Sequence, residues 1–136
     1  MPDKKTLERA RKDAKEGKAP STQAGEFVRE EMDHIREGKH GARSTKQAIA
    51  IGLSKARRAG VKLKPPKAGQ ASESTRKQAA RDTKKGARKT AAKPSAKRSR
   101  ASSNALKREG HSAASHAALS KQAKSAAAKR KRAAGN

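Results

Sequence analysis

Lysine and arginine are the residues of this sequence best suited to binding chemistry, and clusters of them recur throughout its second half. They stand in pairs and quartets such as Arg76-Lys77, Lys84-Lys85 and the run at 129–132. Ammonium groups bind phosphate oxygens as point charges, and guanidinium groups bind them as bidentate forks. Because few carboxylates lie nearby, counterions or a polyanion must relieve the mutual repulsion of these groups. The clusters therefore predict binding to nucleic-acid phosphate.

Further candidate cations lie just before, on and after the segment 45–59. The preceding segment carries Glu26, Glu30, Asp33 and Glu37 along one face, which would keep that face away from phosphate; alternatively, these acids simply pair with the neighbouring bases. No zinc-finger, basic-zipper or homeodomain pattern is present, so we expect backbone binding with little base specificity. The candidate phosphate-binding residues are Arg43, Lys46, Lys55, Arg57, Arg58, Lys62, Lys64, Arg76, Lys77, Lys84, Lys85, Arg88, Lys89, Lys97, Arg98, Arg100, Lys129, Arg130, Lys131 and Arg132.

Catalytic chemistry finds little support in the sequence. His34 could form an acid–base pair with Glu30 or Glu37, but an ordinary surface ion pair explains the same spacing. His111 and His116 lie in a segment with few apolar residues to hold them in place. Walker-type phosphate loops and GxSxG elbows are absent. We expect no enzymatic activity, no cofactor and no metal site.

Composition narrows the class of partner. The 136 residues include 37 Lys or Arg against 12 Asp or Glu, a formal net charge of +25. One Phe and no Trp or Tyr argue against base-stacking platforms. The absence of Cys excludes disulfides and thiolate zinc sites. No secretory leader or long apolar run is evident, so we expect a soluble cytoplasmic protein without membrane contacts.

Apolar residues divide the chain into unlike halves. Residues 1–65 carry 17 basic and 9 acidic residues with ten large apolar side chains after Met1, whereas residues 66–136 carry 20 basic and 3 acidic residues with only Leu106 and Leu119. So little apolar area cannot offset the entropy of ordering a backbone, about 1–2 kcal/mol per residue. We therefore expect an N-terminal amphipathic helix (1–19), a helical hairpin (20–64) and a basic Ala/Lys-rich tail (65–136) that is disordered or transiently helical.

The first half predicts three helices. Asp3 can cap a helix over 4–16, and a second helix starts near Pro20 and ends at Glu37, before Gly38. Ser44 and Gln47 form a capping box for a third helix over 45–59, in which Gln47 can reach the amide of Ser44.

Glycines define the third helix further. Gly60 at its end, followed by Val61, predicts a Schellman stop. Gly52 lies at the centre of its apolar stripe, where a missing side chain would let the second helix approach closely. The fold class we expect is all-α: a small hairpin with an N-terminal helix. Its core is thin, so its stability would depend on a partner or on self-association.

Two resemblances add to these inferences. The runs STQAGEFVREE (21–31) and GKHGARSTKQAIAIGLSKARRAG (38–60) resemble an uncharacterised family of short basic bacterial proteins, which supplies no mechanism. The run TAAKPSAKR (90–98) is similar to the C-terminal arms of linker histones and bacterial histone-like proteins. That likeness implies DNA-backbone binding and compaction by an arm that is disordered when free.

The combined prediction is a nucleoid-associated protein that binds and compacts DNA without sequence specificity. Two alternatives stay open, since RNA carries the same phosphate: an RNA- or ribosome-associated basic protein, and a protein-interaction module docked through its acidic helix.

Overall fold

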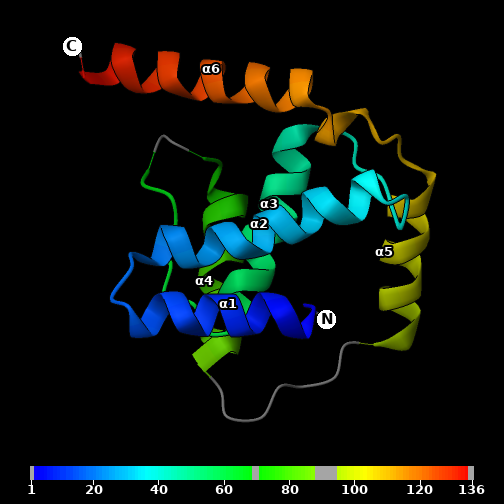
Figure 1. Ribbon diagram of the computed structural model, residues 1–136, viewed down its shortest axis with the longest axis horizontal. Helices are drawn as coiled ribbons and strands as arrows, with labels where there is room; N and C mark the ends of the chain where they lie inside the picture. Colours follow the sequence, from blue (N-terminus) through cyan, green and yellow to red (C-terminus); the bar gives the residue numbers. More distant parts are fainter. Residues whose placement is uncertain (1, 69–70, 88–94, 135–136) are drawn as a thin grey trace. The chain divides into compact units, whose positions relative to one another are not determined.

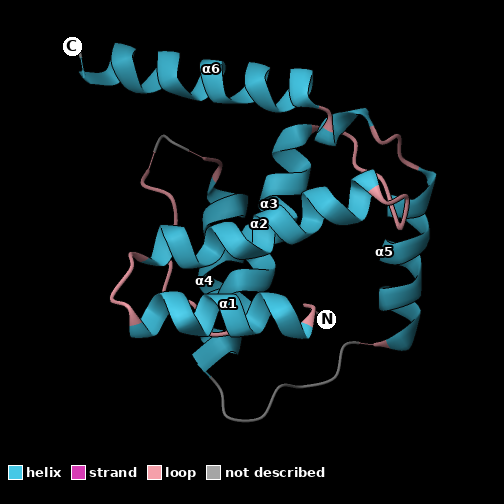
Figure 2. Cartoon of the chain, in the orientation of Figure 1, coloured by secondary structure: helices cyan, strands magenta, loops and turns pink. Residues whose placement is uncertain are grey.

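Helices make up most of the described chain. The computed structural model describes residues 2–68, 71–87 and 95–134, and within these ranges it contains helices and loops but no strand (Figures 1 and 2). The helices are α1 (Lys4–Lys15), α2 (Pro20–Arg36), α3 (Thr45–Arg58), α4 (Glu73–Ala87), α5 (Ala96–Arg108), the short 3-10 helix η1 (Ser112–Ala114) and α6 (His116–Ala134).

The helices belong to two compact units. The first unit comprises Met1–Glu31 and Ala50–Pro94, and therefore holds α1, α4 and parts of α2 and α3. The second unit comprises Met32–Ile49 and Ser95–Asn136, and holds the rest of α2 and α3 together with α5, η1 and α6.

A small apolar core holds the first unit together. Phe27 of α2, 1% exposed, is its largest member, and alanines of α1, α2 and α3 surround it. The buried cluster is Ala10, Ala24, Phe27, Ala56 and Val61, with Leu7, Leu53 and Leu63 packed against it. Small residues dominate this core, so its helices can lie close to one another.

The start of α3 follows the capping pattern with one difference. Ser44 Oγ accepts a hydrogen bond from the amide of Gln47 at 3.1 Å. The side chain of Gln47 reaches back to the amide of Arg43, at 2.6 Å, where the sequence predicts the amide of Ser44. Asp3 precedes α1 as predicted, but its side chain makes no capping hydrogen bond.

The end of α3 is a Schellman motif, as the sequence predicts. Gly60 adopts a φ of 104°, a conformation that disfavours residues with a Cβ. The amide of Val61 donates to the carbonyl of Ala56 at 3.0 Å, and the amide of Gly60 donates to the carbonyl of Arg57 at 3.2 Å. Val61 is thereby directed into the core of the first unit.

Gly52 brings α2 and α3 into backbone contact, which confirms the predicted close approach. A Cβ at this position would lie 2.7 Å from Cα and 2.9 Å from Cγ2 of Val28. Real Cβ atoms essentially never approach so closely. Only glycine permits this crossing without moving a helix.

The prediction of a disordered or transiently helical tail is wrong. Beyond residue 72 the described chain forms α4, α5, η1 and α6. In the first unit, α4 is held by Ala79 and Asp82, which are buried, and by Gly86. A Cβ on Gly86 would lie 1.9 Å from the carbonyl oxygen of Arg57. Close backbone packing and a buried carboxylate therefore replace the large apolar side chains that the tail lacks.

Backbone hydrogen bonds order the tail in the second unit. The amide of Gly41 donates to the carbonyl of Leu106 at 2.8 Å, and the amide of Ala42 donates to the carbonyl of Gly110 at 3.0 Å. A Cβ on Gly41 would lie 2.0 Å from the carbonyl oxygen of Glu109. The loop between α2 and α3 thus lies directly against the end of α5.

Two side chains add to this attachment in the second unit. Thr45 Oγ1 donates to the carbonyl of Ala113 at 2.7 Å, and Arg36 Nε donates to the carbonyl of Ala114 at 3.0 Å. Both alanines are buried, so these bonds satisfy carbonyls that would otherwise lack a donor. Such bonds join residues far apart in sequence and leave no pattern in the composition.

Candidate nucleic-acid interface

Most basic side chains of the described residues are exposed, whereas most acidic side chains are at least partly buried. Of the 34 Lys and Arg residues in the described part of the chain, 31 are exposed, whereas only 5 of the 12 Asp and Glu residues are. Four carboxylates are buried: Asp13, Glu30, Glu31 and Asp82. The surface is therefore more one-sided in charge than the composition alone indicates.

The acidic face of the second helix does not lie outward along its whole length. Glu30, one of the four acids of that face, and its neighbour Glu31 are buried in the first unit. Glu30 Oε1 accepts a hydrogen bond from the amide of Asp3, and Glu31 Oε1 accepts one from the ammonium group of Lys55. Leaving such a carboxylate without a partner in the interior would cost several kcal/mol. These acids serve the fold rather than repel phosphate from a surface.

Two of the expected phosphate-binding cations are placed inside the first unit. Lys55 is half-buried against Glu31. Arg57 is 7% exposed and donates to the carbonyls of Leu63 at 3.3 Å and Lys64 at 3.0 Å. Burial lowers the pKa of Arg57 from its usual value, and the negative charge of Asp82 opposes that shift. Lys55 thus joins α3 to α2, and Arg57 fixes the chain that follows α3.

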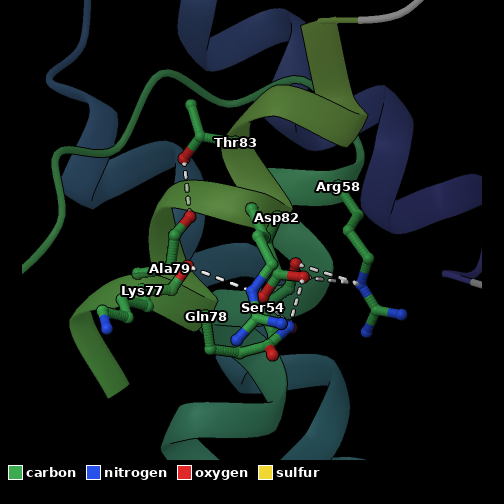
Figure 3. A network of polar contacts seen from close by, with 8 residues as sticks. Ser54, Arg58, Lys77, Gln78, Ala79, Asp82 and Thr83 are labelled. Carbon is green, nitrogen blue, oxygen red and sulfur yellow. Dashed lines mark hydrogen bonds and ion pairs between the residues drawn. The ribbon is translucent and has the colours of Figure 1, made fainter. Parts of the chain in front are cut away.

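Asp82 is the centre of a polar network between α3 and α4 (Figure 3). Ser54 Oγ donates to Asp82 Oδ2 at 2.6 Å, and Gln78 Nε2 donates to Oδ1 at 3.1 Å. The guanidinium of Arg58 lies 3.9 Å from the same carboxylate and is half exposed. In Figure 3 the side chain of Lys77 points away from this network. The network therefore fixes α4 by one face only.

Arg76 also serves the fold. Its side chain is partly buried, and it donates to the carbonyl of Pro66 at 3.0 Å and to Glu73 Oε1 at 2.7 Å. These bonds attach the first turns of α4 to the preceding loop. The expected role of Arg76 in phosphate binding thus competes with two hydrogen bonds that it already makes.

Most of the expected cations do lie on the surface. In the first unit the exposed members are Lys62, Lys64, Lys77, Lys84 and Lys85, with Arg58 partly engaged as described. In the second unit they are Arg43, Lys46, Lys97, Arg98, Arg100, Lys129, Arg130, Lys131 and Arg132. Arg88 and Lys89 lie outside the described residues.

The outer face of α4 contains a further cation, which was missed because it belongs to no adjacent basic pair in the sequence. Arg81 is exposed and lies four residues after Lys77 and three before Lys84, which places all three on one side of the helix. That side is opposite the buried Ala79 and Asp82. Helical spacing, rather than adjacency in sequence, is the signal that identifies Arg81.

The second unit carries basic helices of its own. None of the residues of α5 is buried, and its cations Lys107 and Arg108 are exposed in addition to those expected from the sequence. On α6, Lys121 and Lys124 are exposed as well. Each unit therefore presents exposed cations on helices of its own.

Some exposed lysines are already paired with acidic side chains. Lys18, just after α1, lies 3.1 Å from Glu16 and 3.3 Å from Asp13. Hydrogen bonds to Glu16 and then to Asp13 raise the pKa of Lys18 above its usual 10.5. The region around the end of α1 is therefore basic in composition but partly neutralised.

Residues 3–68 match the model of a family of unknown function, DUF6496. This match confirms the resemblance to an uncharacterised family over the first half of the chain. The matched segment contains α1, α2 and α3 and ends before α4. Comparison with curated proteins and with solved structures gave no match.

No helix within the described ranges combines the length and the apolar character needed to cross a bilayer.

Proposed function

We propose that the protein binds duplex DNA through its phosphates, with little dependence on base sequence, and compacts it in association with the nucleoid. The observation that carries the proposal is the separation of charge: 31 of 34 described bases are exposed, against 5 of 12 acids. A surface of this kind attracts a polyanion and gains free energy when condensed counterions are released.

Duplex DNA fits the exposed cations better than single strands do. Single-strand binders stack bases on aromatic rings, and the one aromatic residue of Phe, Trp or Tyr type in this chain, Phe27, is buried in the core. The major groove of B-form DNA admits an α-helix, whereas the deep, narrow major groove of A-form RNA does not. Rigid basic helices therefore favour DNA over duplex RNA.

Compaction requires contacts with more than one duplex. The two units each carry exposed basic helices, α4 in the first and α5 and α6 in the second. Phosphate binding by both units would let one molecule bridge two duplexes.

The test measures affinity for a short fluorescent duplex as a function of salt, with a scrambled duplex of equal composition as control. Contacts to roughly 6–10 phosphates predict a loss of about 10³–10⁵-fold in affinity between 50 and 200 mM salt. Both duplexes should bind alike, and light scattering of long DNA should rise on addition of protein. A shallow dependence on salt, a strong preference for one sequence, or tighter binding to RNA of the same sequence would contradict the proposal.

A further inference from the structure

An open, shallow space lies between the cationic side chains on the exposed face of α4. An open pocket of about 430 Å³ lies there, lined by Lys77, Ala80, Arg81 and Lys84. Three of its four lining residues are cationic and exposed. The fourth, Ala80, is also exposed and contributes only a methyl group.

Helical geometry explains why the pocket lies at Ala80. Lys77 precedes it by one turn, Lys84 follows it by one turn, and Arg81 is its immediate neighbour. The two lysines are about 10 Å apart along the helix axis at 1.5 Å per residue. A longer side chain at position 80 would fill the space into which the three cations can converge.

The helix that carries the pocket is fixed from behind. Ala79 and Asp82 are buried, and Asp82 accepts the short hydrogen bond from Ser54. Gly86 lies against the carbonyl oxygen of Arg57. Cations on a fixed helix lose less conformational freedom on binding than the same cations on a mobile chain.

The carboxylates near the pocket are engaged elsewhere. Asp82 faces the opposite side of α4, within its network with Ser54 and Gln78. Glu73 accepts the hydrogen bond from Arg76. Three cationic side chains therefore line an open space beside the methyl group of Ala80, and their ammonium and guanidinium groups are donors that bind phosphate oxygens.

We propose that this pocket seats one backbone phosphate of duplex DNA, with Arg81 as the bidentate donor and Lys77 and Lys84 as flanking charges. The assignment rests on the proposed function and specifies one of its contact points. α4 projects this face as a rigid helix, a form that fits the groove of B-form DNA.

The test is a substitution that fills the pocket without changing charge. Ala80→Leu keeps the helix, because leucine is a strong helix former, and leaves all three cations in place. One phosphate contact contributes a salt exponent of about 0.9, which corresponds to about an eightfold change in affinity at 0.1 M salt. We expect Ala80→Leu to weaken duplex binding about eightfold and to lower the salt exponent by about one.

The chain offers a closely matched control at Ala14 of α1. Ala14 is exposed and has Arg11, Lys15 and Lys18 at the same relative positions as the cations around Ala80. There, however, Lys18 is already paired with acids. Ala14→Leu should leave both affinity and salt exponent unchanged.

A double-mutant cycle tests whether Ala80 and Arg81 act on the same phosphate. In the background of Arg81→Gln, the further change Ala80→Leu should weaken binding less than twofold, because the contact is already lost. Circular dichroism must show the same helix content in all variants. Independent effects in this cycle would overturn the assignment.

The outcomes separate this inference from the function on which it rests. If wild-type binding depends steeply on salt but Ala80→Leu behaves like Ala14→Leu, the pocket is not a phosphate site and the proposed function stands. If the wild type shows no steep dependence on salt, the proposed function itself fails. Displacement of the duplex by millimolar inorganic phosphate, or a larger effect of Ala80→Leu on duplex RNA than on DNA, would overturn the choice of a DNA phosphate.

Discussion

Replacing Gly52 with alanine should destabilise the protein although it improves the helix. In the middle of a helix, alanine is favoured over glycine by about 1 kcal/mol. At position 52, however, the new Cβ would lie 2.7 Å from Cα of Val28, where carbon atoms normally stay about 3.5–4.0 Å apart. The contact involves backbone, so α2 and α3 must separate. Overpacking of this kind costs about 1–3 kcal/mol.

Gly25 provides the matched control. It also lies within a helix, α2, but a Cβ there would meet no atom within 4 Å. Gly25→Ala should therefore stabilise the protein by about 0.5–1 kcal/mol. Because the propensity gain is common to both variants, the difference between them isolates the packing term. We expect Gly52→Ala to be about 1–3 kcal/mol less stable than Gly25→Ala.

Urea unfolding of the full chain, followed by circular dichroism, measures this difference. The dependence of the free energy of unfolding on denaturant should be similar in both variants, which would show that the same surface unfolds. Equal free energies of unfolding for Gly52→Ala and Gly25→Ala would refute the argument. The two helices would then not be in contact at Gly52.

Two further predictions test how the tail is attached. Gly86→Ala should detach α4, because its Cβ would lie 1.9 Å from the carbonyl oxygen of Arg57; amide hydrogen exchange should accelerate across α4, and unchanged protection there would contradict the packing. Thr45→Val should cost about 1–3 kcal/mol, because it leaves the carbonyl of buried Ala113 without its donor. Thr45→Ser keeps the hydroxyl and should recover most of that loss; urea melts in which the two variants coincide would show that the hydrogen bond contributes nothing.

Local signals in the sequence predicted the first three helices well. Each starts or ends at a residue with a specific backbone role, such as the capping Ser44 or the positive φ of Gly17, Gly38 and Gly60. These features depend on neighbours within one or two turns, which a sequence displays directly.

The tail was mispredicted because its attachment involves distant partners. A count of large apolar residues predicted disorder, yet α4 is held by Gly86 against Arg57 and by Asp82 against Ser54. Glycine and alanine contribute little apolar area. They stabilise the packing because their small side chains let neighbouring backbones lie close together. Nothing in the order of residues shows that Gly86 will meet the end of α3.

Composition also could not distinguish cations that are exposed from cations that hold the fold. Lys55, Arg57 and Arg76 looked like their neighbours in sequence, but each has interior carboxylates or carbonyls to satisfy. Arg81 belongs to no adjacent pair and is exposed, and its Nε donates to the carbonyl of Lys77 within its own helix at 3.5 Å. Composition therefore supports a proposal for the class of interface, while the packing of each helix shows which cations are already engaged in the fold.

The burial of acids has a consequence for how binding and folding respond to salt. Exposed charges are screened over about 10 Å at 0.1 M salt, whereas buried pairs are screened much less. The attraction of surface cations for phosphate should therefore weaken with added salt, while Glu31 with Lys55 and Asp82 with Ser54 persist in the interior. Because the acids that could neutralise the surface are the ones that stabilise the interior, the same sequence can keep its fold at salt concentrations that release a polyanion.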